Sequence, residues 1–148
     1  MSVYAENRKV RFDYEILETF EAGIVLHGFE VKAIKSGKIS LTGSFVVPKG
    51  EELWLLNADI PPYQANNTPP DYEPTHSRRL LLKKEEIKEL LGKAKSARLT
   101  LVPTKVYNKR GLVKIEIALV RSKKQHDKRD VIRKRETKRE IARTLKRN

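Results

Sequence analysis

Residues 99–120 read LTLVPTKVYNKRGLVKIEIALV, two runs rich in β-branched side chains on either side of the polar segment 108–111. In the second run apolar residues occupy every second position: Val113, Ile115, Ile117 and Leu119. A period of two is typical of a strand that buries one face, and a short polar segment with glycine is typical of the turn between paired strands. The stretch therefore predicts an antiparallel hairpin with one face in the core and the other in water.

The sequence upstream predicts a second hairpin and a strand-rich N-terminal region. In residues 44–56, SFVVPKGEELWLL, the turn-forming segment 48–50 separates two extended runs. Residues 12–34 predict a strand, a bend at residues 21–23, another strand and a short helix with Val31 and Ile34 on one face. Residues 57–74 are polar and proline-rich, and we expect this long connection to lie outside the core.

A strand followed by a helix is predicted after residue 78. The run Leu80-Leu81-Leu82 is typical of a buried strand. In residues 83–95, KKEEIKELLGKAK, apolar residues recur at helical spacing, with acidic residues in the first turn and lysines at the end, as the helix dipole favours. Gly92 predicts that the helix ends close to this position.

These elements define the expected fold class and domain organisation. About six short strands and two or three helices without a βαβ rhythm indicate a mainly β protein, a small antiparallel OB-like β-barrel with peripheral helices. We expect the barrel to occupy residues 1–120 and a basic C-terminal tail to occupy residues 121–148. The sequence has no signal peptide and no apolar run of membrane-spanning length, which favours a cytoplasmic protein with no membrane partner.

The charge of the chain predicts a polyanionic partner. The net charge is +13. Residues 121–148 carry 13 Lys and Arg against 4 Asp and Glu, a net charge of +9 that leaves +4 for residues 1–120. Because the tail has few apolar residues, we expect it to be disordered in the free protein and to form a helix against RNA. A cationic anchor that stays loose is an open alternative.

Most residue patterns of enzymes are missing from the sequence. It has no cysteine, no phosphate-binding glycine loop, and no GxSxG or HExxH motif. None of the three histidines, His27, His76 and His126, has a second histidine or a cysteine at ligand spacing, so we expect no metal, no cofactor and no catalytic residue. Two alternatives stay open: a ribonuclease that uses His126 with Asp127 and Lys128, and a structural ribosomal protein with a basic extension.

Two groups of residues are candidates for RNA binding on their pattern alone. The water-facing side of the last predicted hairpin combines cations with an aromatic ring: Lys105, Tyr107, Lys109, Arg110 and Lys114. The alternative is a solvated lysine face beside a core tyrosine. Arg78 and Arg79 precede the leucine run and are expected at the surface, either pinning an RNA backbone or simply facing water.

Three separated stretches together resemble one known family. They are EAGIVLHGFEVKAIKSGKISL at residues 21–41, RRLLLKKEEIKELLG at residues 78–92 and KKQHDKRDVIRKRETKREIAR at residues 123–143. They resemble the SsrA-binding protein family, SmpB. The resemblance implies a β-barrel with a basic tail, and a function as a partner of transfer-messenger RNA. Members of this family bring that RNA, with elongation factor Tu, to stalled ribosomes and so start trans-translation.

The resemblance also implies roles for individual residues. By the resemblance, residues expected to bind RNA are Asn7, Glu21, Lys35, Leu81 and Lys114. The expected RNA-binding set also includes Lys123 and Lys124 of the basic tail, and Arg78 and Tyr107 from the residue pattern alone. In the tail, residues expected to contact the ribosome, in the decoding centre and the empty mRNA channel, are His126, Asp127, Lys128, Arg129, Ile132, Arg133 and Arg139. We expect a monomer when the protein is free.

Some implied roles have structural alternatives. The carboxylate of Glu21 would instead accept hydrogen bonds from a sharp turn before Gly23, and Leu81 would instead be part of the core. Five positions depart from the family pattern. Lys35 stands where an arginine is usual, and Ser122 and Arg98 stand where a glycine is common. Gly43 and Phe45 stand where an acidic residue and a tyrosine are frequent.

Overall fold

The computed structural model describes residues 2–123 of the 148-residue chain. Within that range the chain forms seven strands, three α-helices and one 3₁₀ helix: β1 (Val3–Glu6), α1 (Arg8–Asp13), β2 (Tyr14–Ile24), α2 (Gly28–Lys35), β3 (Phe45–Lys49), β4 (Glu52–Leu56), η1 (Ala65–Asn67), β5 (Arg78–Leu81), α3 (Lys84–Ala97), β6 (Thr100–Lys109) and β7 (Leu112–Ser122). No helix in this part of the chain is long and apolar enough to cross a membrane.

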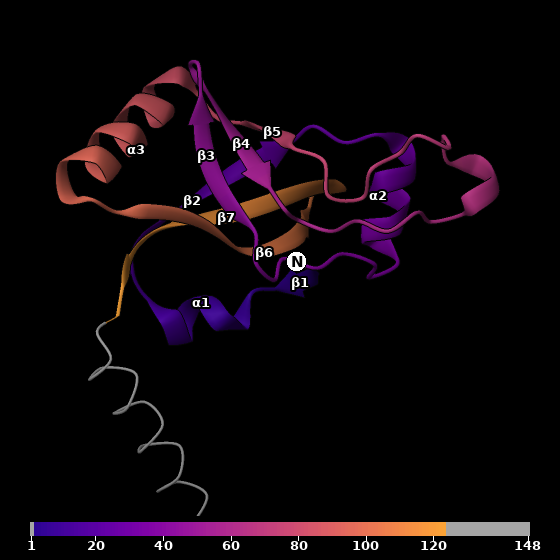
Figure 1. Cartoon of the computed structure of the whole chain (residues 1–148), viewed down its shortest axis with the longest axis horizontal. Helices are drawn as coiled ribbons and strands as arrows, with labels where there is room; N and C mark the ends of the chain where they lie inside the picture. The colour runs from indigo at the N-terminus through magenta and orange to yellow at the C-terminus, as the bar shows by residue number, and fades with distance from the viewer. Residues whose placement is uncertain (1, 124–148) are drawn as a thin grey trace, which may run out of the picture.

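Six of the strands close into an antiparallel barrel (Figure 1). The hydrogen-bonded order around the barrel is β6, β3, β4, β5, β2 and β7, and the pairing of β7 with β6 closes the ring. The long strand β6 pairs with β3 near its start, where Leu101 lies opposite Val46, and with β1 near its end, where Tyr107 lies opposite Val3. The predicted mainly β barrel with peripheral helices is confirmed.

The predicted hairpin of residues 99–120 is the pair β6 and β7, the longest hairpin of the barrel. Ile115 and Ile117 are fully buried, whereas Lys114 and Glu116 keep part of their surface in water. The alternation matches the two faces of β7 up to Ile117, but Ala118 and Val120, on the face predicted to lie in water, are fully buried in a second cluster with Val10 of α1. The predicted water-facing side is therefore wrong at this end of the strand, because α1 packs against it. This strand continues to Ser122, two residues beyond the expected end of the barrel domain.

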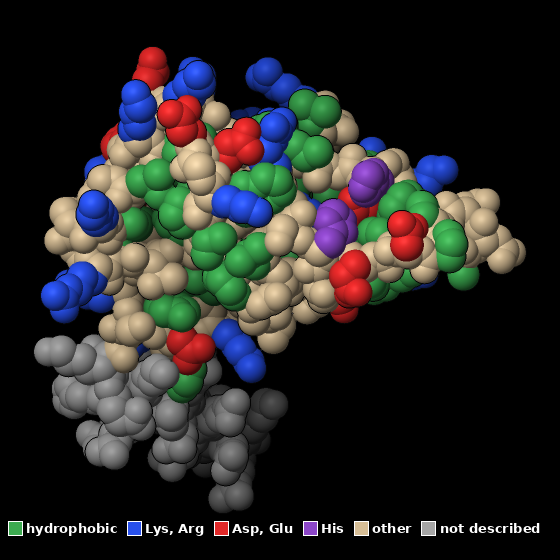
Figure 2. All heavy atoms as spheres, turned by 45° about the horizontal axis from the view of Figure 1, so that its top comes forward, with side chains coloured by type: hydrophobic (Ala, Val, Ile, Leu, Met, Phe, Trp, Pro, Cys, Tyr) green, Lys and Arg blue, Asp and Glu red, His purple; other side chains and the backbone are tan. Residues whose placement is uncertain are grey.

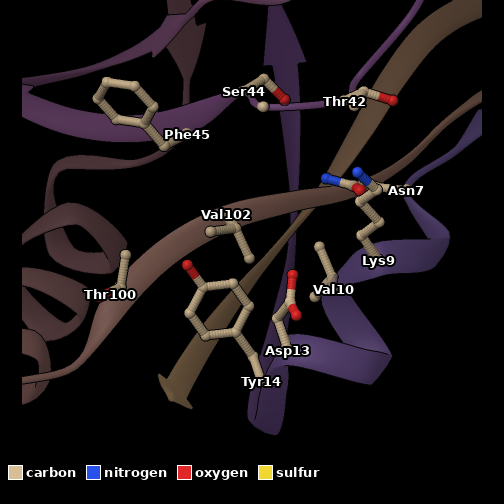
Figure 3. A pocket seen from close by; sticks show the side chains of 11 residues that line it. Asn7, Lys9, Val10, Asp13, Tyr14, Thr42, Ser44, Phe45, Thr100 and Val102 are labelled. Atoms are coloured by element: carbon tan, nitrogen blue, oxygen red, sulfur yellow. The ribbon is translucent and has the colours of Figure 1, made fainter. Parts of the chain in front are cut away.

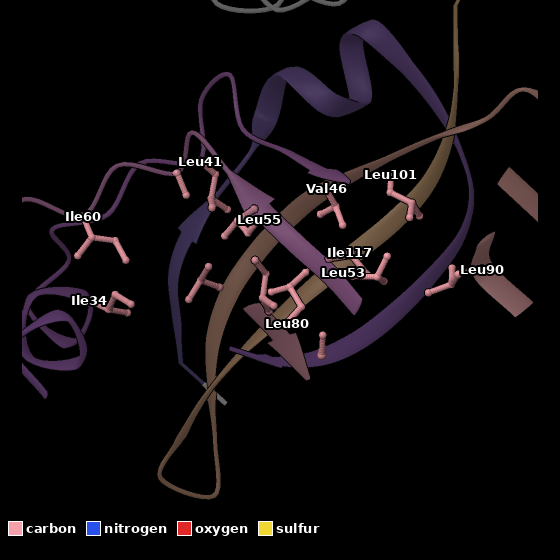
Figure 4. Close-up of a cluster of buried hydrophobic side chains, with 14 of the residues drawn as sticks. Ile34, Leu41, Val46, Leu53, Leu55, Ile60, Leu80, Leu90, Leu101 and Ile117 are labelled. Atoms are coloured by element: carbon pink, nitrogen blue, oxygen red, sulfur yellow. The ribbon is translucent and has the colours of Figure 1, made fainter. Parts of the chain in front are cut away.

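The core fills the barrel and continues under the helices at both ends (Figure 4). Leu53, Leu55 and Ile117 are fully buried between the strands. At one end Leu90 of α3 closes the barrel, and at the other end Ile34 of α2 packs into the same cluster. The helices thus close the two ends of the barrel, and each needs apolar residues only along the side that faces the core.

Three expectations about local structure are wrong. Strand β2 runs without a bend through residues 21–23, because Glu21, Ala22 and Gly23 each pair with a residue of β7. The connection at residues 57–74 is not entirely outside the core, since Ala58 and Ile60 are fully buried. The prediction missed these two buried residues because the connection as a whole is poor in apolar residues.

The third wrong expectation concerns the end of α3. The helix continues through Gly92 to Ala97, and Arg98 ends it with a left-handed backbone conformation at φ 53°. The N–H of Arg98 donates to the carbonyl of Ala94, a usual way to end a helix. Glycine is the residue best suited to this conformation, which gives a physical reason for the glycine expected at this position.

Candidate nucleic-acid interface

The outer face of the barrel brings together residues from four strands. Leu81 of β5 pairs with Gly23 of β2, Gly23 pairs with Lys114 of β7, and Lys114 pairs with Tyr107 of β6. Paired residues in a sheet share a face, and Glu21, two residues before Gly23, shares it as well. Glu21, Gly23, Leu81 and Lys114 line one open groove, which we call the β2 groove; Leu82, Lys83 and Glu86 also line it.

Leu81 is an apolar platform on this surface and not part of the core. Its neighbour Leu80 is 2% exposed, whereas Leu81 is 48% exposed, so the prediction of a fully buried leucine run is wrong at this position. Leu81 leans over Gly23, where a Cβ atom would come within 3.2 Å of the Leu81 Cβ. An exposed leucine beside a glycine offers an apolar contact for a base or a ribose.

The carboxylate of Glu21 is held by two side chains of β6. The Tyr107 hydroxyl donates a hydrogen bond to Oε2, and Lys109 Nζ lies 3.2 Å from each carboxylate oxygen. The hydrogen bond from Tyr107, with the charge of Lys109, lowers the pKa of Glu21 against the opposing effect of burial. The alternative that Glu21 caps a sharp turn is wrong, because β2 has no turn there. An ionised carboxylate accepts from N–H and O–H groups of RNA and repels phosphate.

Tyr107 is a buried residue that holds the carboxylate of Glu21. The residue is only 4% exposed, and Lys105 Nζ lies 5.5 Å from the centre of its ring. Burial, together with the hydrogen bond to Glu21, raises the pKa of Tyr107 and keeps its hydroxyl a donor. The expectation of an aromatic ring open to RNA is therefore wrong, and the side chain positions Glu21 instead.

Arg78 is buried, which overturns its expected place at the surface. It is 1% exposed, and its guanidinium donates to Glu30 through Nε (2.7 Å). The remaining hydrogen bonds of the guanidinium go to the hydroxyl of Tyr72 and the carbonyl oxygens of Ala58, Pro74 and His76. A guanidinium has five N–H donors, and Arg78 uses all five inside the protein. It has no donor left for an RNA phosphate.

Glu30, the partner of Arg78, was not singled out by the sequence. It lies on the buried face of α2 with Ala33 and Ile34, and that helical spacing is the only signal that marks it. Its carboxylate also accepts from the backbone N–H of His27 (2.9 Å) and the hydroxyl of Tyr72 (3.1 Å). Burial opposes ionisation, but these hydrogen bonds and Arg78 outweigh it and lower the pKa of Glu30.

His27, Glu30 and His76 are close enough to hold a metal ion, with ligand atoms within 4.8 Å of one another. The electrostatics oppose this. The carboxylate of Glu30 already neutralises Arg78, and a metal cation would lie next to the guanidinium. The cluster formed by Glu30, Arg78, Tyr72 and His76 is a structural connection between α2 and the segment after β4, and we call it the Glu30 cluster.

The other expected RNA-binding residues lie outside the β2 groove. Lys35 is exposed at the end of α2 and does not line it. Asn7 precedes α1 and faces the segment that carries Thr42 and Ser44 (Figure 3). Lys123 is held against α1, where its Nζ donates to the carbonyl of Arg11 (2.6 Å). Lys124 and the expected ribosome-binding residues, His126 to Arg139, lie outside the described residues.

The surface around these sites is mixed in character. On the face shown in Figure 2, hydrophobic side chains gather over the middle of the barrel, with charged side chains around them. The β2 groove combines the same ingredients at close range: an apolar platform, a fixed carboxylate and a lysine. Phosphate, ribose and base each find a matching group there, so the arrangement suits a folded RNA.

Comparison with known proteins identifies the family. The model of the SmpB protein family matches residues 4–147. The SsrA-binding protein of Trichormus variabilis is 49% identical over 144 residues, 97% of this chain and 93% of the relative, and that of Thermosynechococcus vestitus is 47% identical over 146 residues, 99% and 96% of the two chains. A solved structure described as "tmRNA-SmpB: a journey to the center of the bacterial ribosome" is 45% identical, with a TM-score of 0.69 over 90% of this chain and 96% of that one. The resemblance expected from the three sequence stretches is confirmed, and the chain belongs to the SmpB protein family.

Proposed function

We propose that the chain is an RNA-binding adaptor that binds the tRNA-like domain of transfer-messenger RNA and delivers this RNA to stalled ribosomes for trans-translation. Membership of the SmpB family supports the RNA and the ribosome as partners, and it supports an adaptor and not an enzyme. The structural observation on which the proposal rests is the β2 groove. It joins Glu21, Leu81 and Lys114, which lie 60 and 33 residues apart in the sequence, on one face of the barrel.

Three residues of the groove have chemically distinct tasks in this proposal. Lys114 supplies a cation for a phosphate, and Leu81 supplies an apolar platform for a base or ribose. Glu21, fixed by Tyr107, supplies an acceptor that phosphates avoid. A groove that only collected phosphate would not need Glu21 or Leu81. The combination therefore favours recognition of a particular RNA shape over general binding of nucleic acid.

The tail has a separate task in this proposal. Residues 121–148 carry a net charge of +9, which suits a channel walled by RNA phosphates. We assign His126, Asp127, Lys128 and Arg129 to the decoding centre, and Ile132, Arg133 and Arg139 to the empty mRNA channel. A channel that still holds a message excludes the tail sterically, so the adaptor acts where the message has run out. The cytoplasm as location, elongation factor Tu as an indirect partner and a monomeric free protein belong to the same proposal.

Competitive binding tests the division between barrel and tail. A variant that ends after Lys123 keeps all of β7 and is titrated with the tRNA-like domain, with an ordinary tRNA as competitor, at increasing salt. We expect the truncated protein to prefer the tRNA-like domain at every salt concentration, and the full chain alone to support tagging on stalled ribosomes. Equal binding of both RNAs that collapses steeply with salt would mean that only phosphate is read, and would contradict the proposal.

A further inference from the structure

A second groove, between α1 and the outer face of β6 and β7, carries two cations on its helix side and one on its strand side. Arg8 and Arg11 of α1 line it together with Lys105 of β6. Arg8 and Arg11 are three residues apart and therefore share a face of the helix. Within residues 2–123, none of these three cations has an ion-pair partner. We call this the α1 groove.

Two acidic residues share the strand side of the α1 groove with Lys105, and the two arginines lie opposite them on α1. Glu6 and Glu116 also line the groove, on the strand side. Glu116 accepts a hydrogen bond from the hydroxyl of Thr104 next to it, and Lys105 is paired in register with both glutamates without forming an ion pair. The guanidinium groups of Arg8 and Arg11 remain available for an anion with several oxygens, such as a phosphate.

The α1 groove lies next to the β2 groove. Lys105 pairs with Glu116, and Glu116 pairs with Glu21 of the β2 groove. Neighbouring strands are about 4.8 Å apart, so the backbones at Lys105 and Glu21 are separated by roughly 10 Å. An RNA that lies in the β2 groove therefore brings its backbone within reach of the cations of the α1 groove.

Asn7 fixes the position of α1 and has no hydrogen-bond donor left for an RNA. Its Nδ2 donates to the carbonyls of Leu41 (3.3 Å) and Pro103 (3.1 Å). Its backbone N–H donates to the carbonyl of Thr104 (2.7 Å). All three N–H bonds of Asn7 are thus used inside the protein, and its remaining side-chain oxygen is an acceptor, which phosphate repels. What these bonds fix is the start of α1, directly before Arg8.

We propose that the α1 groove is a second RNA contact, in which Arg8, Arg11 and Lys105 bind the phosphate backbone of the RNA held in the β2 groove, with Asn7 as the residue that positions α1. This inference rests on the proposed function and extends it to a surface with a different chemistry. The β2 groove distinguishes one RNA from another, and the α1 groove adds affinity that depends on salt.

Salt dependence of binding tests the three cations in the full-length protein. Binding of the tRNA-like domain is measured at several KCl concentrations for Arg8→Gln, Arg11→Gln and Lys105→Gln. Each lost phosphate contact should reduce the slope of log affinity against log salt by about 0.7–0.9, and the triple variant by about 2–3. Lys88→Gln, the same change on an exposed residue of α3, is the matched control and should leave the slope as in the natural protein.

The outcomes separate this inference from the proposed function. If the natural protein does not prefer the tRNA-like domain over ordinary tRNA, the proposed function fails. If it does, but the triple variant keeps the slope of the Lys88→Gln control, the α1 groove is not a phosphate contact and the inference fails.

A double-mutant cycle tests the positioning role of Asn7. Asn7→Ala is introduced into the natural protein and into the Arg8→Gln/Arg11→Gln variant, and thermal unfolding confirms that all four proteins are folded. We expect Asn7→Ala to weaken binding and flatten the salt slope in the natural protein, and to have little further effect where the arginines are already gone. An equal loss of affinity in both backgrounds would mean that Asn7 contacts the RNA itself, and would overturn the positioning role.

Discussion

Strand β5 places Arg78 and Leu81, three residues apart, in environments opposite to those that their side chains usually occupy. Arg78 is 1% exposed and Leu81 is 48% exposed. The arginine is acceptable inside because the Glu30 cluster satisfies all of its donors and neutralises its charge. The leucine is acceptable outside because it lies over Gly23 in the β2 groove, where an RNA can cover it. The buried charge serves the fold, and in the proposed function the exposed hydrophobic residue serves RNA binding.

The largest expected effect comes from removing the buried charge. Arg78→Ala leaves the carboxylate of Glu30 buried without its partner, which should lower the free energy of unfolding by about 3–5 kcal/mol. Urea unfolding measures this directly. RNA affinity per folded molecule should stay unchanged. A variant with normal stability and weak RNA binding would show that Arg78 belongs to the RNA interface and not to the fold.

The second largest effect on stability should come from acid, which weakens the Glu30 cluster. Because the folded state lowers the pKa of Glu30 below its ordinary value of 4.5, ionisation of Glu30 stabilises the fold fully above pH 4.5. That stabilisation is lost as the pH falls through the lowered pKa. Unfolding free energies between pH 7 and pH 3 should show the loss, and Glu30→Gln should show a smaller dependence on pH. Identical pH profiles would mean that Glu30 does not contribute.

The exposed leucine should show the reverse behaviour. Leu81→Ala should change the free energy of unfolding by less than about 0.5 kcal/mol. It should weaken binding of the tRNA-like domain by about 1 kcal/mol, roughly fivefold, because about half of the leucine surface is left to be covered by RNA. Leu17→Ala, on a leucine that is 44% exposed and lines neither groove, is the control for loss of surface leucine. A large loss of stability would place Leu81 in the core after all.

A smaller effect is expected for the residue that holds Glu21. Tyr107→Phe removes one hydrogen bond, worth about 1 kcal/mol, and leaves the ring in place. The pKa of Glu21 should rise toward 4.5, because the hydrogen bond from Tyr107 is the largest cause of its lowering. Carboxyl titration by NMR measures the shift, and RNA binding should weaken a few-fold. An unchanged pKa would show that Lys109 alone fixes the carboxylate.

The smallest effect should concern stability alone. Arg98→Gly relieves a left-handed conformation that costs a residue with a side chain about 1–2 kcal/mol, although glycine loses more chain entropy on folding. The net gain in unfolding free energy should be about 0.5 kcal/mol, with no change in RNA binding. A change in affinity would mean that stability and RNA binding are less separate than the contrast between Arg78 and Leu81 indicates.

Local sequence patterns were reliable where one element carries its own signal. The alternation in residues 113–117 predicted the two faces of that part of β7, and the helical spacing of Ile87 and Leu90 predicted the face of α3 that closes the barrel. The same reasoning failed at Leu81. A run of three leucines has no alternation, and the glycine that exposes the middle one lies on another strand, 58 residues earlier.

The mainly β barrel, the basic tail and the family could be predicted from the sequence, because strand alternation, charge and three long motifs are all properties of contiguous residues. Which charged residues are buried and which stay at the surface became clear only from the folded structure. Arg78 and Arg79 are adjacent and chemically identical, yet one is enclosed by Glu30 and the other is exposed. The reason is that burial of a charge depends on partners that the fold brings from distant segments, and no local pattern records where those partners will be.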